Sequence, residues 1–229
     1  VLRDPLLSAL AREDLGTLSL DERRTLTNAC FRANHKTMLE PYPQYKRLHE
    51  LYLMATTDSD SGLAYFSGDY FADLVTWYHL AWCGETERRR RPVIAQLLSK
   101  GWAFAREDRA ALLREIGEII AGLIPRYREL EAGGRVELSA TPFAHPLAPL
   151  LIDLACARQA MPEAPLPVAK TYPGGRTRVA AHIDAARTSH AARLGHEPAG
   201  MWPAEGALSD PFVAMLGDST VNDVHVARG

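Results

Sequence analysis

A tryptophan and a glutamate, Trp202 and Glu205, stand three residues apart in the segment Gly-Met-Trp-Pro-Ala-Glu-Gly at residues 200–206. An exposed indole can stack on a pyranose ring, and a carboxylate beside it can meet the positive charge that develops at an anomeric carbon. The glycines allow backbone to approach a ligand closely, and Pro203 fixes the local path. The segment therefore predicts a sugar-processing site. The competing interpretation is a surface loop with an ordinary glutamate and a half-buried tryptophan.

A second group of polar side chains precedes this segment. Residues 135–139 alternate in polarity and predict a short strand, with Glu137 on one face and apolar residues on the other. The loop 141–146, which contains His145, follows that strand. A second strand is expected over 199–204. Strand, loop and helix in repetition are typical of parallel α/β units, whose functional loops follow the strand ends. Glu137 has an alternative interpretation, an outward strand residue.

Helices are expected to position these loops. The first two-thirds of the chain reads as helical, and the later part alternates. The predicted helices cover 20–41 after a Ser19 cap, 45–54, 71–83 (with a strand as the alternative), 106–130 with a kink at Pro125, 147–160 and 178–194. The polar run 56–62 is expected to be a flexible loop, and 161–175, with four prolines, an extended connection. The charge run 85–91 reads as a solvated turn, and a phosphate or acidic-partner patch is the alternative.

The other aromatic and histidine residues favour packing roles. Trp77, Trp82 and Trp102 are predicted to lie in the core, because large aromatics dominate protein interiors. His79 stands in an apolar run and is predicted to be a hydrogen-bonded core histidine rather than a ligand. The remaining histidines show no Glu-flanked His-x-x-x-His pattern, so no zinc site is predicted.

Composition narrows the classes of function. The chain has 229 residues, 47% hydrophobic, with 26 basic against 28 acidic residues. This balance leaves no excess of basic residues that would indicate binding to nucleic acid. No apolar run reaches the length of about 18 residues that a membrane-spanning helix needs. Three separated cysteines, Cys30, Cys83 and Cys156, fit reduced thiols in a cytoplasmic protein better than disulfides. No cofactor is predicted, and the oligomeric state stays open.

The two motif segments, 134–146 and 200–206, resemble two signature regions of glycoside hydrolase family 57, which contains α-amylase-like, α-glucanotransferase and branching enzymes. The segments 41–45, 77–82 and 172–175 also resemble that family. The resemblance extends over about residues 20–216 and implies an α/β fold, a partial, helix-rich (β/α)7-type barrel with few parallel strands. Within one incomplete catalytic domain, it assigns 1–132 to a mainly helical insertion, 133–216 to strand-loop-helix units and 217–229 to an irregular tail.

The resemblance also implies roles for the motif residues. Enzymes of this family retain anomeric configuration, which takes two carboxylates about 5–5.5 Å apart. By this resemblance Glu205 is the nucleophile, Trp202 part of the sugar platform, and Glu137 and His145 line the donor subsite, with His145 donating a hydrogen bond to a hydroxyl. The implied substrate is an α-glucan or oligosaccharide.

The departures from the family pattern matter as much as the matches. The family's opening His-Gln-Pro-like signature and its later general-acid Asp have no counterpart here. Asp210 reads as a helix cap, and Asp218 and Asp223 lie in the tail without signature context. We therefore expect an isolated fragment that does not turn over and that self-associates through unpaired strand edges. Two alternatives stay open, a carbohydrate-binding relic of the fold and a helical interaction domain.

Overall fold

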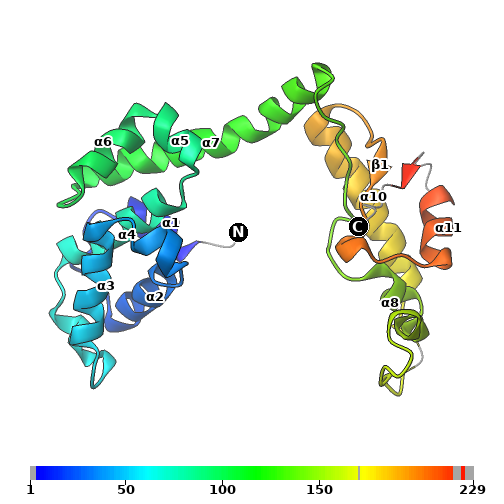
Figure 1. The fold of residues 1–229 in the computed structure, drawn as a ribbon, viewed down its shortest axis with the longest axis horizontal. Coiled ribbons are helices and arrows are strands. Elements are labelled where there is room, and N and C mark those ends of the chain that lie inside the picture. The colour runs from blue at the N-terminus through cyan, green and yellow to red at the C-terminus, as the bar shows by residue number, and fades with distance from the viewer. Residues whose placement is uncertain (1–3, 170, 219–222, 225–229) are drawn as a thin grey trace. The chain divides into compact units, whose positions relative to one another are not determined.

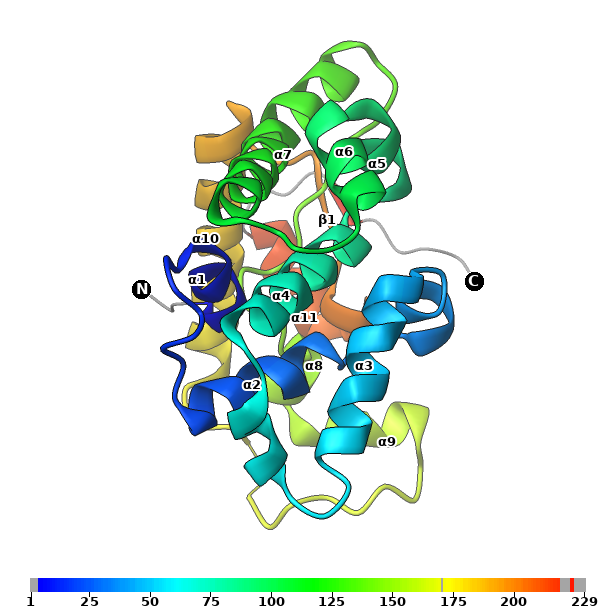
Figure 2. The same cartoon turned by 90° about the vertical axis from the view of Figure 1, so that its left-hand side faces the viewer.

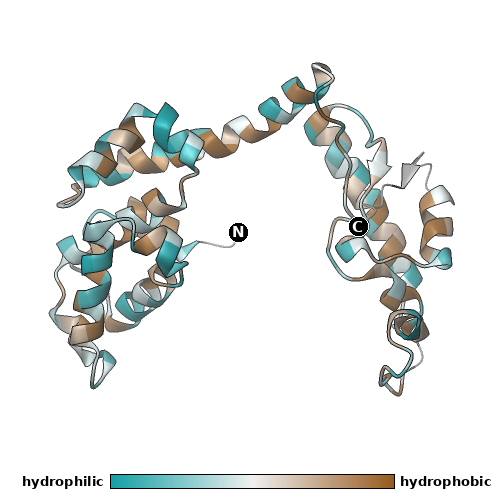
Figure 3. Ribbon diagram, viewed as in Figure 1, coloured by the Kyte–Doolittle hydropathy of each residue, from teal (hydrophilic) through white to brown (hydrophobic). Residues whose placement is uncertain are grey.

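The computed structural model describes residues 4–169, 171–218 and 223–224. Helices dominate them and the sheet is small (Figure 1). The helix-rich character predicted from the sequence is therefore confirmed. The chain forms two compact units, an N-terminal unit (Val1–Ile120) and a C-terminal unit (Ala121–Gly229). The long helix α7 (Arg106–Ala132), with Pro125 inside it, begins in the first unit and ends in the second. Hydrophilic and hydrophobic residues alternate along the ribbon of α7 in Figure 3.

The N-terminal unit is built from short helices with local sequence signals at their ends. Ser19 and Glu22 form a reciprocal capping box at the start of α2. The predicted end of this helix near residue 41 is wrong, because Asn34 caps a new π-helical turn by accepting from the Thr37 amide. The elements are α1 (Pro5–Ala11), α2 (Leu20–Cys30), η1 (His35–Leu39), α3 (Pro43–Ala55), η2 (Asp60–Tyr65), α4 (Gly68–Trp82), α5 (Glu85–Arg90) and α6 (Pro92–Lys100).

Helix α4 forms the centre of this unit. The apolar run predicted as a buried helix is confirmed as one, and the strand alternative is wrong. Phe71, Leu74 and Trp77 are buried, and α1, α2 and α3 pack around α4 (Figure 2). His79 is a core histidine, as predicted, with Nδ1 2.7 Å from the Val75 carbonyl oxygen. Burial lowers the pKa of this imidazole.

The C-terminal unit packs helices around β1. Met201 is fully buried among Ile183, Phe212 and other apolar residues of the helices. The single helix predicted over 147–160 is wrong, because Asp153 is extended (φ −151°) and its side chain accepts from the Ala155 amide, which starts a new turn. The elements are α8 (Ala148–Ile152), η3 (Leu154–Cys156), α9 (Ala157–Ala160), α10 (Gly175–Leu194), β1 (Gly200–Met201), η4 (Ala204–Gly206), α11 (Asp210–Asp218) and β2 (Asp223–Val224).

The sheet is much smaller than the sequence predicts. β1 pairs in parallel with β2, and Ala140 forms an isolated parallel bridge with Met201. The predicted parallel direction is confirmed, but residues 136–139 form no regular strand and β1 is shorter than 199–204. A barrel needs every strand to pair on both sides. Within the described ranges, pairing is limited to these short segments, so no barrel is formed there.

Candidate functional site

Backbone hydrogen bonds bring the two sequence motifs together. The Ala140 amide donates to the Gly200 carbonyl at 3.0 Å, and the Trp202 amide donates to the Ala140 carbonyl at 2.7 Å. The pairing is parallel, so the two segments run in the same direction and the loops that follow them begin at the same end of the small sheet. The loops that carry the predicted site residues therefore start side by side, as parallel strands require.

Helix α10 holds the first of these loops. The Phe143 amide donates to the carbonyl of His182 on α10 at 3.0 Å, and Pro142 is buried. On α10, Ile183 and its apolar neighbours point into the core of the unit. The loop is thus fixed at its base while His145, further along, is exposed.

The second loop has an unusual backbone at Glu205. This residue adopts φ 54° and ψ 21° within η4, and Gly206 follows at φ 67°. The left-handed region is uncommon for residues other than glycine and clusters at functional sites. Pro203 and Ala204 are buried, and the Gly206 amide donates to the Pro203 carbonyl at 3.0 Å. A buried base and a tight turn therefore direct the Glu205 carboxylate outward.

The side chains of the two loops meet directly. His145 Nε2 lies 3.0 Å from Glu205 Oε1, although the two residues are 60 positions apart in sequence. An ionised Glu205 accepts this hydrogen bond from the imidazole N–H. Both side chains are well exposed, at 57% and 72%. An exposed pair of this kind adds little stability, so its main effect is to orient the carboxylate.

The other predicted site residues, Trp202 and Glu137, take no part in the hydrogen bond between His145 and Glu205. Trp202 directly follows β1, with 38% of its surface exposed, and stands three positions before Glu205. Glu137 is exposed and stands outside the His145–Glu205 hydrogen bond. Asp210 is the first residue of α11 rather than its cap; the Ser209 carbonyl accepts from the first turn.

The tail aspartates are described by their backbone alone. Asp218 ends α11 and Asp223 lies in β2, paired with Gly200, while 219–222 and 225–229 lie outside the described residues. Among the residues that the structure describes, no cluster of three or more His, Cys, Asp or Glu side chains could hold a metal ion. Around Glu205 the structure thus places one carboxylate and one imidazole in hydrogen-bond contact, with the exposed Trp202 three positions earlier in the chain.

Two of the tryptophans predicted to pack in the core do not. Trp77 is buried at 2% exposure, but Trp82 and Trp102 are 56% and 69% exposed. Trp82 lies at the end of α4, and Trp102 follows Gly101, which has φ 75°. Gly101 was an available signal for the end of α6, since a left-handed glycine commonly ends a helix, but it carries no signal for the exposure of Trp102.

Comparison with known proteins places the chain in a family. No match was found among the curated proteins or among the solved structures. The described helices include none with the length and apolar character to cross a bilayer. The sequence model of glycosyl hydrolase family 57 matches residues 19–220, which include both motif loops and almost all of the two units. The chain is therefore a member of glycosyl hydrolase family 57, whose activities are those of glycoside hydrolases and transferases.

Proposed function

We propose that this chain forms the nucleophile-bearing part of a retaining glycoside hydrolase or transglycosylase that acts on α-glucans. Glu205 is the nucleophile, Trp202 stacks on the sugar ring, and His145 and Glu137 line the donor subsite. The observation that carries the proposal is the 3.0 Å hydrogen bond between His145 and Glu205, which joins two motifs that the family match covers.

In this mechanism a Glu205 oxygen attacks the anomeric carbon. A carbon–oxygen bond to the enzyme forms as the bond to the leaving group breaks, and water or an acceptor sugar later displaces Glu205. His145 keeps the attacking carboxylate in place through its Nε2–H. Its hydrogen bond to a sugar hydroxyl stays a prediction of the sequence. The left-handed turn at Glu205 aims the carboxylate away from the buried base of the loop.

The leaving group of a natural glycan also needs an acid. A retaining enzyme places this acid about 5–5.5 Å from the nucleophile. The family resemblance assigns this acid to an Asp of a later signature, and that signature has no counterpart in residues 1–229. We therefore expect the 229-residue chain to bind glycans but not to cleave them. A non-catalytic carbohydrate-binding role is the second candidate, and it is supported by the same observation.

A 5-fluoro-α-glucosyl fluoride separates the two candidates. Fluoride leaves without protonation, so a competent nucleophile forms the glycosyl-enzyme even where the acid is absent. We expect mass spectrometry of the purified chain to show one added 5-fluoroglucosyl group, and peptide mapping to place it on Glu205. Maltopentaose incubated with the same chain should stay uncleaved.

Three outcomes are distinct. A label on Glu205 supports the nucleophile, whereas a label on another residue contradicts it. Absence of a label together with saturable quenching of tryptophan fluorescence by maltopentaose favours the binding role. Absence of both the label and the quenching removes the proposed sugar site altogether and leaves a helical interaction domain.

A further inference from the structure

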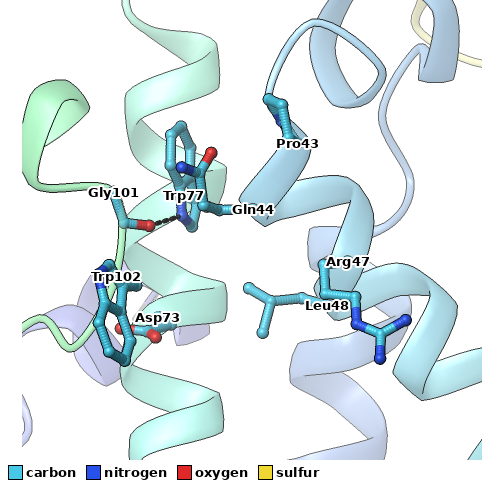
Figure 4. Close-up of a pocket in the computed structure, with 8 residues that line it drawn as sticks. All are labelled: Pro43, Gln44, Arg47, Leu48, Asp73, Trp77, Gly101 and Trp102. Atoms are coloured by element: carbon cyan, nitrogen blue, oxygen red, sulfur yellow. Dashed lines mark hydrogen bonds between the residues drawn. The ribbon is translucent and has the colours of Figure 1, made fainter.

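A second exposed indole, that of Trp102, lines a cavity in the N-terminal unit, and no residue of the segments 134–146 and 200–206 lines it. The cavity has a volume of about 400 Å³, within the range of small-molecule sites. Figure 4 shows its two walls, with Gln44 and Leu48 of α3 on one side and Asp73 and Trp77 of α4 on the other, next to Trp102. All of these residues belong to one compact unit.

The loop that presents Trp102 is rigidly built. Gly101 and Ala103 flank the tryptophan with φ of 75° and 53°, two left-handed residues around one outward side chain. The indole Nε1–H of buried Trp77 donates to the Gly101 carbonyl at 2.8 Å. The indole of Trp102 is therefore exposed because of the backbone geometry, and not because the loop is loosely attached.

Asp73 holds the other end of this loop. Its two carboxylate oxygens accept from the amides of Ala103 at 3.1 Å and Phe104 at 2.9 Å. Burial raises the pKa of this carboxyl, and the two amide bonds oppose that effect. Each carboxylate oxygen accepts more than one hydrogen bond, so Asp73 can still accept from a hydroxyl in the cavity.

Two further polar groups at the cavity are available to a ligand. In the described part of the chain, neither the Gln44 amide nor the Trp102 Nε1–H has a hydrogen-bond partner. The Gln44 amide nitrogen lies 3.0 Å from the position that a Cβ on Gly101 would take. A larger residue at position 101 would therefore crowd this amide. Arg47 pairs with Glu50 at 3.3 Å, which partly offsets its charge.

We propose that this cavity is a second sugar-binding site, which takes one neutral glucosyl ring of an α-glucan. The apolar face of the ring stacks on Trp102, and ring hydroxyls donate to Asp73 and exchange hydrogen bonds with Gln44. A carboxylate at the wall disfavours phosphate groups, because like charges repel. The choice of an α-glucan rests on the function proposed above. The site itself is remote in sequence from Trp202 and Glu205 and can be tested independently of them.

The test uses the indole N–H signals of the complete chain in two-dimensional ¹H–¹⁵N NMR, assigned by single Trp→Phe variants. Titration with maltopentaose should shift the Trp102 signal saturably. The Trp82 signal is the matched control, because Trp82 is similarly exposed but does not line the cavity. Trp77 reports the integrity of the loop through its bond to Gly101. We expect Gln44→Leu to weaken the affinity read at Trp102 at least fivefold while the Trp77 signal keeps its position in the free protein.

The pattern of shifts separates this inference from the proposed function. Shifts at both Trp102 and Trp202 support both. A shift at Trp102 without one at Trp202 supports the cavity and counts against the motif site. A shift at Trp202 alone, no shift at either, or equal shifts at Trp102 and Trp82 overturns the second site. An unchanged affinity in Gln44→Leu with a native Trp77 signal also overturns it.

Discussion

Two exposed tryptophans, Trp102 and Trp202, stand beside turns with the same uncommon backbone. Ala103 has φ 53° and Glu205 has φ 54°, and each left-handed residue lies next to or within three positions of the indole. Both turns have buried residues at their base. In the first turn the left-handed residue follows the indole directly. In the second it is the proposed nucleophile itself.

The supports of the two turns differ. The Trp102 turn is held by Asp73 and Trp77 from the core of one helical unit. At the second turn the backbone is bonded to Ala140, but the Glu205 side chain contacts an exposed imidazole. A binding surface can thus be completed within one set of packed helices, whereas a two-carboxylate reaction centre draws its groups from several parallel strands. The comparison can be tested by changing one support at a time.

The largest effect is expected for Glu205→Gln. The amide keeps the size of the side chain but removes the attacking charge, so labelling by 5-fluoro-α-glucosyl fluoride should slow at least ~1000-fold. Intact-mass kinetics measure this rate. Glu137→Gln, a change to the other motif glutamate, should slow labelling less than about tenfold. If the two variants behave in the opposite way, Glu137 and not Glu205 is the nucleophile.

Asp73→Ala should lower stability most among changes at the Trp102 turn. Two amides lose a charged acceptor, which costs about 2–4 kcal/mol of unfolding free energy. Urea denaturation measures this loss, and the Glu205 labelling rate should stay within twofold of the parent chain. Asp184→Ala, at an exposed position of α10, is the control for removal of a carboxylate. A small loss of stability in Asp73→Ala would show that the turn does not depend on the half-buried Asp73 carboxylate.

His145→Ala should slow labelling of Glu205 by about two- to fivefold, because an exposed hydrogen-bonded pair of this kind contributes up to about 1 kcal/mol. His145→Gln, whose side-chain amide can also donate, should restore part of the rate. This partial recovery distinguishes an orienting role from a purely structural one. His35→Ala, a change of the same type in the N-terminal unit, should have no effect on the rate. Equal rates for His145→Ala and the parent chain would contradict the role of the 3.0 Å contact.

Glycine at either left-handed residue should stabilise the protein. Ala103→Gly and Glu205→Gly each remove a steric cost of about 1 kcal/mol, less the chain entropy that glycine adds. Thermal melts should show a small rise for both, while only Glu205→Gly abolishes labelling. Ala110→Gly in helix α7 is the opposite control and should cost up to about 1 kcal/mol. A fall in stability for both variants would show that the positive φ angles are not maintained in solution.

The smallest effect concerns the segment that leads into β1. The backbone carbonyl of Glu197 and the Glu131 carboxylate, 2.7 Å from Nε2, raise the pKa of His196 above 6.5. A raised pKa in the folded state means that this contact stabilises the fold below about pH 6.5 and loses its effect as pH rises through the folded-state pKa. The melting temperature of the parent chain minus that of His196→Asn should therefore be largest at pH 6 and approach zero by pH 9. Glu131→Gln should remove part of this pH dependence, because the Glu197 carbonyl remains, and a difference that grows with pH would contradict the assignment.

Local signals allowed much of the helical fold to be predicted. The capping box at Ser19 and the apolar run of α4 define their helices through contacts within a few residues. The broken helix after Leu147 was missed because Asp153 competes locally with the helix by accepting from the backbone. The barrel was inferred from the family resemblance. Only short parallel segments are present in the described residues, since strands are stabilised by partners distant in sequence.

The sequence by itself determined the family, most of the helical elements and the two motif loops with Trp202, Glu205 and His145. These features depend on residue type and on spacing along the chain, which determine the helix caps, the hydrophobic periodicity and the functional groups that the side chains carry. The tertiary structure alone decided that His145 meets Glu205, that Glu205 is left-handed, and that Trp102 is exposed over a cavity. Each of these arises where segments far apart in sequence pack together, and spacing along the chain carries no information about that geometry.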